Sequence, residues 1–501
     1  MRVVIRADAS VWIGSGHIMR CLVLADALKS LGHEVIFACL PLEGNLFSII
    51  EQRGFPISQL SLPENPIVIQ HDADYSAWLQ RPQEQDAADF ISNINHADLV
   101  VTDHYAIDHV WQDKVREALQ CKLVALDDLR RSHSADLVID QTLGRKSNDY
   151  PTCERVLAGT SYALLSPQFV KHRNRAFCRK TSDNIPRILI SMGGVDLPNA
   201  TSQVINAVVG TYRANFTVLL SPRSPHYQQV KTMCEQIPNV THLDFSNNMA
   251  ELMLDHDCAI GAPGTTSWER ACLGLPNIVI PLAENQRETS IQLEAAGAAL
   301  VVQLNEIDSG LVNKLTLITT SWPQYVDANL RICDGLGANR VASEMVNICH
   351  PLQQSENQYK LVPASIDDIS IVYEWQRHPN TRRFALNPNV PSWEEHLAWM
   401  NAKLKSHNDF FYMICEISTG SKVGVVRLDK SGQDYVISIF IDPFRYGKGI
   451  ATEALRLVDT RHSDLVIKAT VLKDNQASQK LFLNAKYRRL TSETFIREPR
   501  N

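Results

Sequence analysis

The sequence IGSGHIMR at positions 13–20 joins a short apolar run to an amphipathic segment, and it decides the fold of the first half of the chain. Before it, residues 3–5 predict a buried strand that leads to Asp8. After it, apolar residues recur at helical spacing until Gly32, which predicts the end of a helix. A strand, a glycine turn and a helix in this order are typical of a doubly wound α/β domain, where the helix start can bind an anion.

His17 falls in the first turn of this predicted helix, where the positive end of the helix dipole disfavours imidazolium. We therefore expect a neutral ring, which can take a proton from water. Gly14 and Gly16 let the backbone approach a ligand closely, and Ser15 lies between them. On this stretch alone, a glycine-rich turn with a polar residue at the helix start is an equally simple alternative.

The composition predicts an ordinary soluble protein of several domains. The chain has 501 residues, enough for about three domains. Its net charge of −6 gives no electrostatic footprint for nucleic acid or anionic lipid, and its apolar runs are too short to span a bilayer. The 11 cysteines and 16 histidines show no metal-ligand spacing, so we expect reduced thiols and no metal. Met1 leads directly into a strand, which favours a cytoplasmic location.

Short apolar runs recur along the chain and divide it into three predicted domains. In the first two domains each run ends in polar or glycine residues, as buried parallel strands do when their carboxyl ends face a site. These runs are residues 34–39, 98–103, 122–127 and 136–140, then 187–191, 217–220, 258–260 and 277–280. We expect doubly wound domains over 1–180 and 181–350 with a cleft between them. A polar linker at 350–358 precedes a mixed α+β domain over 359–501.

Three loops at predicted strand ends of the second domain favour a nucleotide diphosphate site. They are 191–196 with Met192, Gly193 and Gly194, then 261–269 with Glu269, then 281–287 with Asn285 and Gln286. Thr266 and Glu269 have the spacing of a capping box, in which the carboxylate only closes the helix start. A carboxylate at that place could equally accept both ribose hydroxyls, so the spacing leaves the two roles open.

These motifs resemble one family of nucleotide-sugar enzymes. The segments RAD (6–8), IGSGHIMR (13–20), CLPLEG (39–44), DHY (103–105), LDD (126–128), SYALL (161–165) and SMGGVD (191–196) resemble those of the UDP-2,4-diacetamido-2,4,6-trideoxy-β-L-altropyranose hydrolases of pseudaminic acid biosynthesis. That family is similar in fold to the GT-B glycosyltransferases, and the resemblance extends to about residue 340. It implies that His17 is catalytic and that the second domain holds UDP through its glycine loops and Glu269.

Three polar residues at strand ends of the first domain are further candidates for the sugar side of this site. Asp8, Asp103 and Tyr105 could orient the catalytic ring or the acetamido groups of the sugar. For Asp8 and Asp103 purely structural roles have the same support. The chemistry implied by the resemblance is inverting: water assisted by His17 attacks the anomeric carbon, and helix-start N–H groups stabilise the departing UDP without a metal.

The third domain contains a second predicted anion site. A strand at 435–441, a glycine loop and a helix at 452–458 resemble the acetyl-CoA pyrophosphate loop of the GNAT N-acetyltransferases. The resemblance implies acetyl-CoA as co-substrate. Its cofactor-binding residues would be Arg445, Tyr446, Gly447, Lys448, Gly449, Ile450, Ala451 and Asn475.

Two departures from the GNAT pattern bear on that activity. Tyr446 stands where the family has Gln or Arg, with Arg445 adjacent, and Phe482 stands where many members have a tyrosine that protonates the thiolate. A domain that has lost its activity and serves for interaction is therefore an alternative.

In the pathway of the hydrolases, the preceding step acetylates the 4-amino group of the UDP-sugar, so the chain is expected to combine consecutive reactions. For the first half, a GT-B glycosyltransferase with another acceptor and a nucleotide-sugar-binding regulator are the rival hypotheses.

Overall fold

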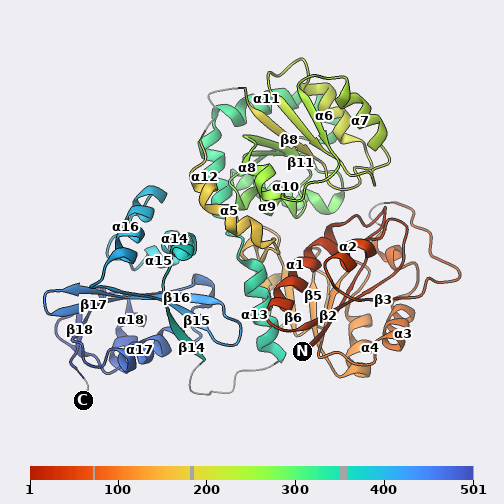
Figure 1. Cartoon of the computed structure of the whole chain (residues 1–501). Coiled ribbons are helices and arrows are strands. Elements are labelled where there is room, and N and C mark those ends of the chain that lie inside the picture. Colours follow the sequence, from red (N-terminus) through yellow and green to blue (C-terminus); the bar gives the residue numbers. More distant parts are fainter. Residues whose placement is uncertain (72–73, 181–184, 350–357, 500–501) are drawn as a thin grey trace. The chain divides into compact units, whose positions relative to one another are not determined.

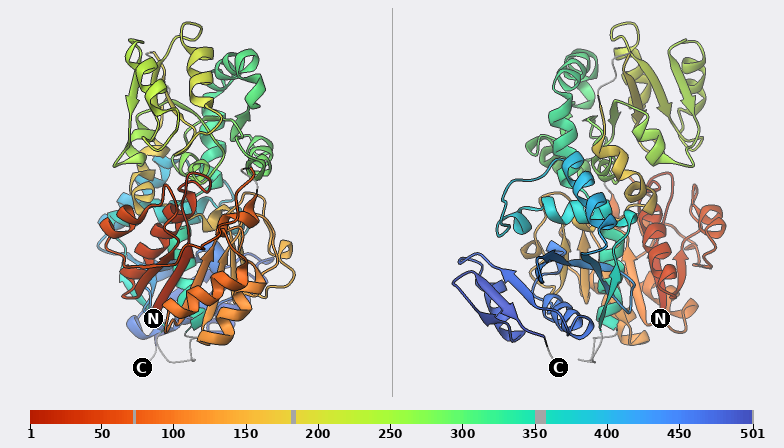
Figure 2. Two further views of the ribbon diagram at one scale, coloured as in Figure 1. Left: turned by 90° about the vertical axis from the view of Figure 1, so that its right-hand side faces the viewer. Right: turned by 60° about the vertical axis from the view of Figure 1, so that its left-hand side comes forward.

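The computed structural model describes residues 1–71, 74–180, 185–349 and 358–499 (Figures 1 and 2). The chain forms two compact units, Met1–Pro351 and Leu352–Asn501. The first two predicted domains together make up the first unit. The predicted border at residue 181 and the predicted linker residues 350–357 lie outside the described residues. No described helix is long and apolar enough to cross a membrane.

The first sheet of unit 1 is parallel and has the strand order β3-β2-β1-β4-β5-β6-β7. The chain order reverses between β1 and β4, and ligands of doubly wound sheets bind at such a switch point. The strands β1, β2, β4, β5 and β6 are almost wholly buried, which explains their near-continuous apolar sequences. They span Arg2–Ala7 (β1), Glu34–Cys39 (β2), Ile57–Gln59 (β3), Leu99–Asp103 (β4), Lys122–Leu126 (β5), Leu137–Asp140 (β6) and Val156–Ala158 (β7).

The second sheet of unit 1 repeats this topology with the order β10-β9-β8-β11-β12-β13, again parallel. Its switch point lies between β8 and β11. The strands span Arg187–Ser191 (β8), Asn215–Leu219 (β9), Val240–Leu243 (β10), Cys258–Gly261 (β11), Asn277–Val279 (β12) and Ala299–Val301 (β13). The predicted pair of Rossmann-like domains is therefore confirmed. The strands β3, β7, β10 and β13 were not predicted; they lie at the edges of the two sheets and are less buried than the central strands.

The helices of unit 1 cover the faces of the two sheets (Figure 1). In the first half they span Gly16–Ser30 (α1), Phe47–Gln52 (α2), Gln83–Asn93 (α3), His109–Leu119 (α4) and Pro167–Phe177 (α5). In the second half they span Ala200–Val208 (α6), Tyr227–Glu235 (α7), Met249–Leu254 (α8), Thr266–Cys272 (α9), Arg287–Ala295 (α10), Ile307–Thr320 (α11), Trp322–Ile332 (α12) and Gly337–Cys349 (α13).

Helix α13 packs on the sheet of the first half and helix α5 packs against helices of the second half, which differs from the predicted division at residue 180. Val341 and Met345 of α13 lie in the core of the first sheet, against α1. Phe169 and Ala176 of α5 lie in a core shared with α8 and α9 of the second half. The apolar stripe of a helix shows that one face is buried, but it does not show which sheet the helix covers.

Unit 2 contains a mixed sheet with the order β14-β15-β16-β17-β18-β20-β19, in which only β17 and β18 pair in parallel. This confirms the predicted α+β class. The strands span Tyr359–Pro363 (β14), Phe410–Glu416 (β15), Lys422–Ser431 (β16), Asp434–Ile441 (β17), Ile467–Thr470 (β18), Arg488–Arg489 (β19) and Thr494–Arg497 (β20). The helices span Ile369–Arg377 (α14), Pro379–Arg382 (α15), Trp393–Lys405 (α16), Ile450–Arg461 (α17) and Gln476–Asn484 (α18).

Candidate active sites

His17 and Asp103 meet at the carboxyl edge of the first sheet, beside its switch point. His17 lies in the first turn of α1, as predicted, and Asp103 is the last residue of β4, where its register partner on β1 is Ala7. Nδ1 of His17 lies 2.6 Å from Oδ1 of Asp103, and both side chains are buried. An ionised carboxylate can only accept, so Nδ1 carries the proton and Nε2 of a neutral ring presents its lone pair.

Arg20 keeps Asp103 ionised. Its Nε donates to Oδ2 at 2.7 Å and its Nη2 donates to Oδ1 at 2.6 Å, which is a bidentate pair. Burial alone would raise the pKa of Asp103, but the charge of Arg20 and the hydrogen bonds from Arg20 and His17 outweigh it and hold that pKa far below its usual value. The sequence reasoning missed Arg20, although its spacing of three residues from His17 places both on one helix face.

A second carboxylate and an aromatic wall complete this side of the site. Nη1 of Arg20 donates to Asp128 at 2.8 Å, and the hydroxyl of Tyr105 donates to the same carboxylate at 2.8 Å. The Tyr105 ring lies edge-on to His17, with 4.7 Å between centroids, and stacks on Trp78. The side chain of Asn285, which comes from the second half of unit 1, lies close enough to the Tyr105 hydroxyl to affect its pKa, although burial, which raises that pKa, is the largest cause of its shift.

The two predicted glycine loops face each other across the halves of unit 1. A Cβ added to Gly194 would lie 3.2 Å from Oγ of Ser15, so the loop after β8 approaches the loop that leads into α1. Gly193, at φ +95°, and Gly14, at φ +76°, occupy backbone conformations that favour glycine. Gly16 is the first residue of α1, and space for a Cβ is open there.

Two predicted ligand contacts of the second half have other roles for their side chains. Met192 is 3% exposed and packs in the core of the second sheet, so only its backbone can face a ligand. Oε1 of Gln286 accepts from the backbone N–H of Leu282 at 2.8 Å and thereby shapes its own loop. Apolar and amide residues in a glycine loop often support the loop itself, and spacing alone does not separate this role from ligand contact.

Glu269 does not form the capping box that its spacing allowed. The cap residue of α9 is Thr265, and no side-chain hydrogen bond closes this helix start. Glu269 is half-buried and accepts no hydrogen bond from any described residue. Burial raises the pKa of its carboxyl to about 7, although the charge of Arg270 opposes the shift. A half-buried carboxylate without a hydrogen-bond donor is free to accept ligand hydroxyls.

Asp8 is placed for a structural role. Its side chain is fully buried, forms an ion pair with Arg6 at 2.8 Å and accepts from the backbone N–H of Leu40 at 2.7 Å. These contacts fasten the end of β1 to the end of β2. Of the two roles that the sequence left open for Asp8, the geometry favours the structural one.

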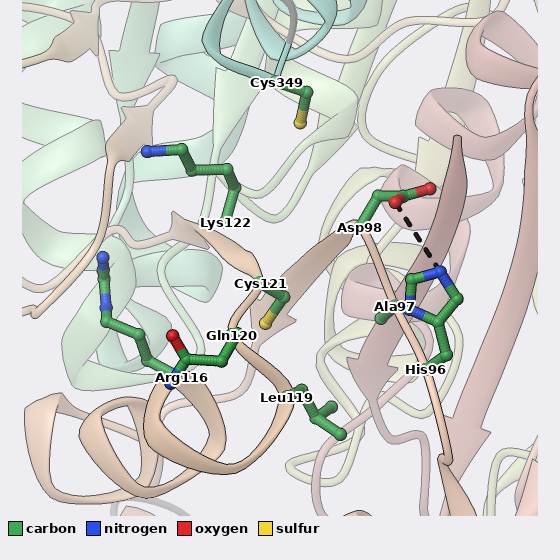
Figure 3. A pocket seen from close by; sticks show the side chains of 9 residues that line it. All are labelled: His96, Ala97, Asp98, Arg116, Leu119, Gln120, Cys121, Lys122 and Cys349. Atoms are coloured by element: carbon green, nitrogen blue, oxygen red, sulfur yellow. Dashed lines mark ion pairs between the residues drawn. The ribbon is translucent and has the colours of Figure 1, made fainter.

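A hollow of about 390 Å³ lies at the other edge of the first sheet (Figure 3). It is lined in part by Asp98, which precedes β4, and by Lys122, the first residue of β5. His17 lies beyond the opposite, carboxyl ends of these strands, so this hollow is separate from the catalytic candidates. Within the described residues, no group of three or more His, Cys, Asp or Glu side chains could hold a metal.

The candidate acetyl-CoA site of unit 2 lies where β17 and β18 separate. Their parallel register covers Tyr435 to Ile437 of β17, and β17 continues to Ile441. The loop residues 446–449 are exposed, with Gly447 at φ +79° and Gly449 at φ +75°. Gly449 is the cap residue of α17, which begins at Ile450. The predicted strand, glycine loop and helix are therefore present. Lys448 lies between the two glycines, and Ala451 lies in the first turn of α17.

Two predicted contacts of this site are used elsewhere. Arg445 is 7% exposed, and its Nη1 lies 3.4 Å from Oε2 of Glu416. Its side chain therefore points into the protein and does not take the place of the Gln or Arg that the GNAT family has at the position of Tyr446. Asn475 caps α18 by accepting from the backbone N–H of Ser478 at 3.1 Å. The cap role of Asn475 is local and could have been found from its place at a helix start, whereas the contact of Arg445 depends on the position of β15.

The aromatic residues at the two departures from the GNAT pattern also have defined places. Tyr446 is 47% exposed on the loop, and its hydroxyl lies 3.3 Å from Oγ1 of Thr381. Phe482 is buried in the core, where it stacks on Phe495.

Comparison with known families and structures agrees with this architecture. Residues 190–329 match the glycosyltransferase family 28 C-terminal domain, and residues 359–488 match the acetyltransferase (GNAT) domain. The crystal structure of CalG4, the calicheamicin glycosyltransferase, superposes with a TM-score of 0.51 at 14% identity, covering 71% of this chain and 99% of that one. This likeness shows that unit 1 has a glycosyltransferase fold of the GT-B type.

Three curated proteins resemble the chain in sequence, and two of them show which parts of the chain are shared. An uncharacterized protein of Methanocaldococcus jannaschii is 25% identical over 502 residues, covering 96% of each chain, so the likeness spans both units. The UDP-2,4-diacetamido-2,4,6-trideoxy-beta-L-altropyranose hydrolase of Campylobacter jejuni is 25% identical over 304 residues, covering 59% of this chain and 97% of its own. The chain therefore combines a GT-B fold, similar in sequence to that hydrolase, with a C-terminal GNAT domain, which implies acetyl-CoA as a co-substrate.

Proposed function

We propose that unit 1 hydrolyses UDP-2,4-diacetamido-2,4,6-trideoxy-β-L-altropyranose to UDP and the free sugar. The observation that carries this proposal is the pairing of His17 with Asp103 at the edge where the loops of Ser15 and Gly194 approach each other. Cleavage of a sugar–phosphate bond by water requires a base that takes the water proton and donors that stabilise the departing phosphate. His17 oriented by Asp103 would be the base, and backbone N–H groups of the two loops would be the donors.

The reaction follows from the ring tautomer of His17 in which Nδ1 donates to Asp103 and Nε2 presents its lone pair. A water oxygen attacks the anomeric carbon while Nε2 takes the water proton, and the bond from that carbon to the UDP oxygen breaks with its electron pair leaving on UDP. Backbone N–H groups of the glycine loops stabilise the charge that UDP gains. Because water attacks the face opposite UDP, the anomeric configuration inverts.

Asp103 is a positioning residue in this mechanism, since it touches His17 and no reacting atom. Its hydrogen bond fixes the ring orientation, and its negative charge stabilises the imidazolium that forms as the proton is taken. Arg20 holds the carboxylate from its other side. The similarity to the Campylobacter hydrolase supports the substrate class.

The test is release of UDP from the purified chain and the UDP-sugar in the absence of any acceptor. We expect UDP and free sugar in equal amounts, with the inverted sugar anomer formed first. UDP release only on addition of an alcohol or lipid acceptor would instead support a glycosyltransferase. Tight binding without turnover would support a nucleotide-sugar-binding regulator.

UDP affinity is expected to depend on the ionisation of Glu269. If its carboxylate accepts both ribose hydroxyls, binding favours the ionised form, so affinity rises with pH through about 7. Affinity at pH 6 should be roughly tenfold lower than at pH 8. Calorimetric titration with UDP measures this, and Glu269→Gln, which cannot ionise, corrects for titration of the nucleotide itself. An identical pH profile in the variant would exclude Glu269 from the site.

We further propose that unit 2 transfers an acetyl group from acetyl-CoA to the 4-amino group of the UDP-sugar precursor. The amine nitrogen attacks the thioester carbonyl, the carbon–sulfur bond breaks, and the nitrogen loses a proton as coenzyme A leaves as the thiol. The separation of β17 from β18 and the loop of Gly447 and Gly449 support binding of the co-substrate. Acetylation followed by loss of UDP would then be consecutive reactions of one chain.

Gly449→Val is expected to reduce thiol release from acetyl-CoA by about tenfold or more. Gly449 has φ +75°, which a β-branched residue adopts at a cost of roughly 1–3 kcal/mol, so the loop must change shape. Gly432→Val is the matched control, because Gly432 has φ +66° in the hairpin between β16 and β17. The Gly432→Val variant introduces a comparable backbone strain, but at a place outside the loop of Gly447 and Gly449. Equal activity of the two variants in a thiol assay with the UDP-4-amino sugar would refute the role of the loop.

A further inference from the structure

Arg223 lies in the loop after β9, on the same edge of the second sheet as the loop of Gly193 and Gly194. The parallel register of β8 and β9, which ends at Ile190 and Val218, brings the carboxyl ends of these two strands together. The loop containing Arg223 therefore lies beside a glycine loop of the candidate nucleotide site. Arg223 was not among the residues that the sequence pointed to.

Arg223 also touches the first half of unit 1. Its Nη2 donates to the carbonyl oxygen of Gly44 at 2.5 Å. The segment around Gly44 is itself bound to the loop that leads to Ser15, since the backbone N–H of Val11 donates to the carbonyl of Glu43 at 3.1 Å. The guanidinium is therefore bonded to the segment that adjoins the loop leading to Ser15, and its own loop follows β9, the neighbour of β8 in the sheet.

The charge of Arg223 has no counterion among the described residues. No carboxylate of the described chain lies within 4.0 Å of its guanidinium, although the side chain is half-buried. Burial lowers the pKa of Arg223, and no acidic neighbour offsets the effect. The other arginines of this region differ: Arg20 pairs with Asp103 and Asp128, and Arg145 pairs with Asp140.

A half-buried guanidinium has five N–H donors and a charge that water no longer fully solvates. One donor is used by Gly44. The remaining donors form a planar fork that fits two oxygens of one phosphate group. An anionic ligand at this place would neutralise the charge of Arg223 and accept its remaining hydrogen bonds.

We propose that Arg223 binds phosphate oxygens of the nucleotide diphosphate in the cleft of unit 1. This inference rests on the nucleotide site of the proposed function, and it adds a charged contact to a site otherwise built from backbone N–H groups. Arg223 would then recognise the diphosphate and neutralise the charge of the departing UDP.

The test compares the binding of UDP and of uridine, which lacks phosphate, to the full-length chain by calorimetry. Arg223→Gln keeps a donor for Gly44 and removes the charge, so UDP affinity should fall about tenfold while uridine affinity stays unchanged. Arg223→Lys, which keeps the charge, should lie within about threefold of wild type, and UDP binding by Arg223→Gln should depend less on salt than wild-type binding.

Arg213→Gln is the matched control, because Arg213 is exposed at the amino end of the same strand. It should bind UDP as wild type does. Unchanged UDP affinity in Arg223→Gln, or equal losses for UDP and uridine, would overturn the inference. Wild-type chain that binds UDP through Arg223 but releases none from the UDP-sugar would overturn the proposed hydrolysis and leave this inference standing.

Discussion

Replacing His17 with asparagine is expected to slow UDP release by about two to four orders of magnitude, the usual contribution of a general base. Asparagine retains a polar N–H that can donate to Asp103, but it has no basic nitrogen at the place of Nε2. The loss should appear in kcat, while UDP affinity measured by calorimetry stays close to that of wild type.

A matched control is available on the same sheet. His96 is exposed at the opposite edge, beside the hollow drawn in Figure 3. His96→Asn makes the same chemical change and should leave UDP release unaltered. Equal initial rates for His17→Asn and wild type would remove His17 from its assigned role, and another base would have to be sought.

Asp103→Asn is expected to lower kcat by about a thousandfold, comparable to the effect of removing the orienting carboxylate from a catalytic triad. The amide can donate to Nδ1, which favours the ring tautomer with the proton on Nε2. That tautomer cannot accept a proton from water. Initial rates of UDP release near neutral pH measure the loss.

The same substitution should also destabilise the fold. Arg20 is 5% exposed and would lose its bidentate partner, and breaking a buried ion pair costs roughly 3–5 kcal/mol. Asp128→Asn separates the two effects, because Asp128 is the other carboxylate on Arg20 and does not touch His17. Asp128→Asn should retain most of the rate. A rate for Asp103→Asn as high as that of Asp128→Asn would show that the His17 contact has no catalytic role.

The parts of the sites that follow from consecutive residues could be predicted from the sequence. The strand, glycine turn and helix around His17 are encoded within residues 3–32, and the loop of Gly447 and Gly449 is encoded in the same manner. Both depend on local backbone conformation and on hydrophobic periodicity, which a single sequence carries. The second half of unit 1 repeats the pattern, which is why its doubly wound class could be inferred as well.

Partners distant in the chain could not be predicted. Asp103 was expected near the cleft, but its contact with His17 results from the pairing of β1 with β4, which are separated in the chain by β2, β3 and the three α-helices α1, α2 and α3. The inward turn of Arg445 toward Glu416 similarly depends on the position of β15. The sequence pattern predicts the strand or loop in which each of these residues lies. Which side chain the residue contacts depends on the sheet topology, which the pattern does not show.

Helix α13 packs on the first sheet, and α5 packs against helices of the second half. This crossing of the two helices has a consequence for where the chain can be divided. A fragment that ends near residue 180 lacks Val341 and Met345, so the apolar surface of its own sheet is left uncovered. A division of the chain that separates unit 2 and leaves the core of the first sheet intact therefore has to fall after Cys349, the last residue of α13.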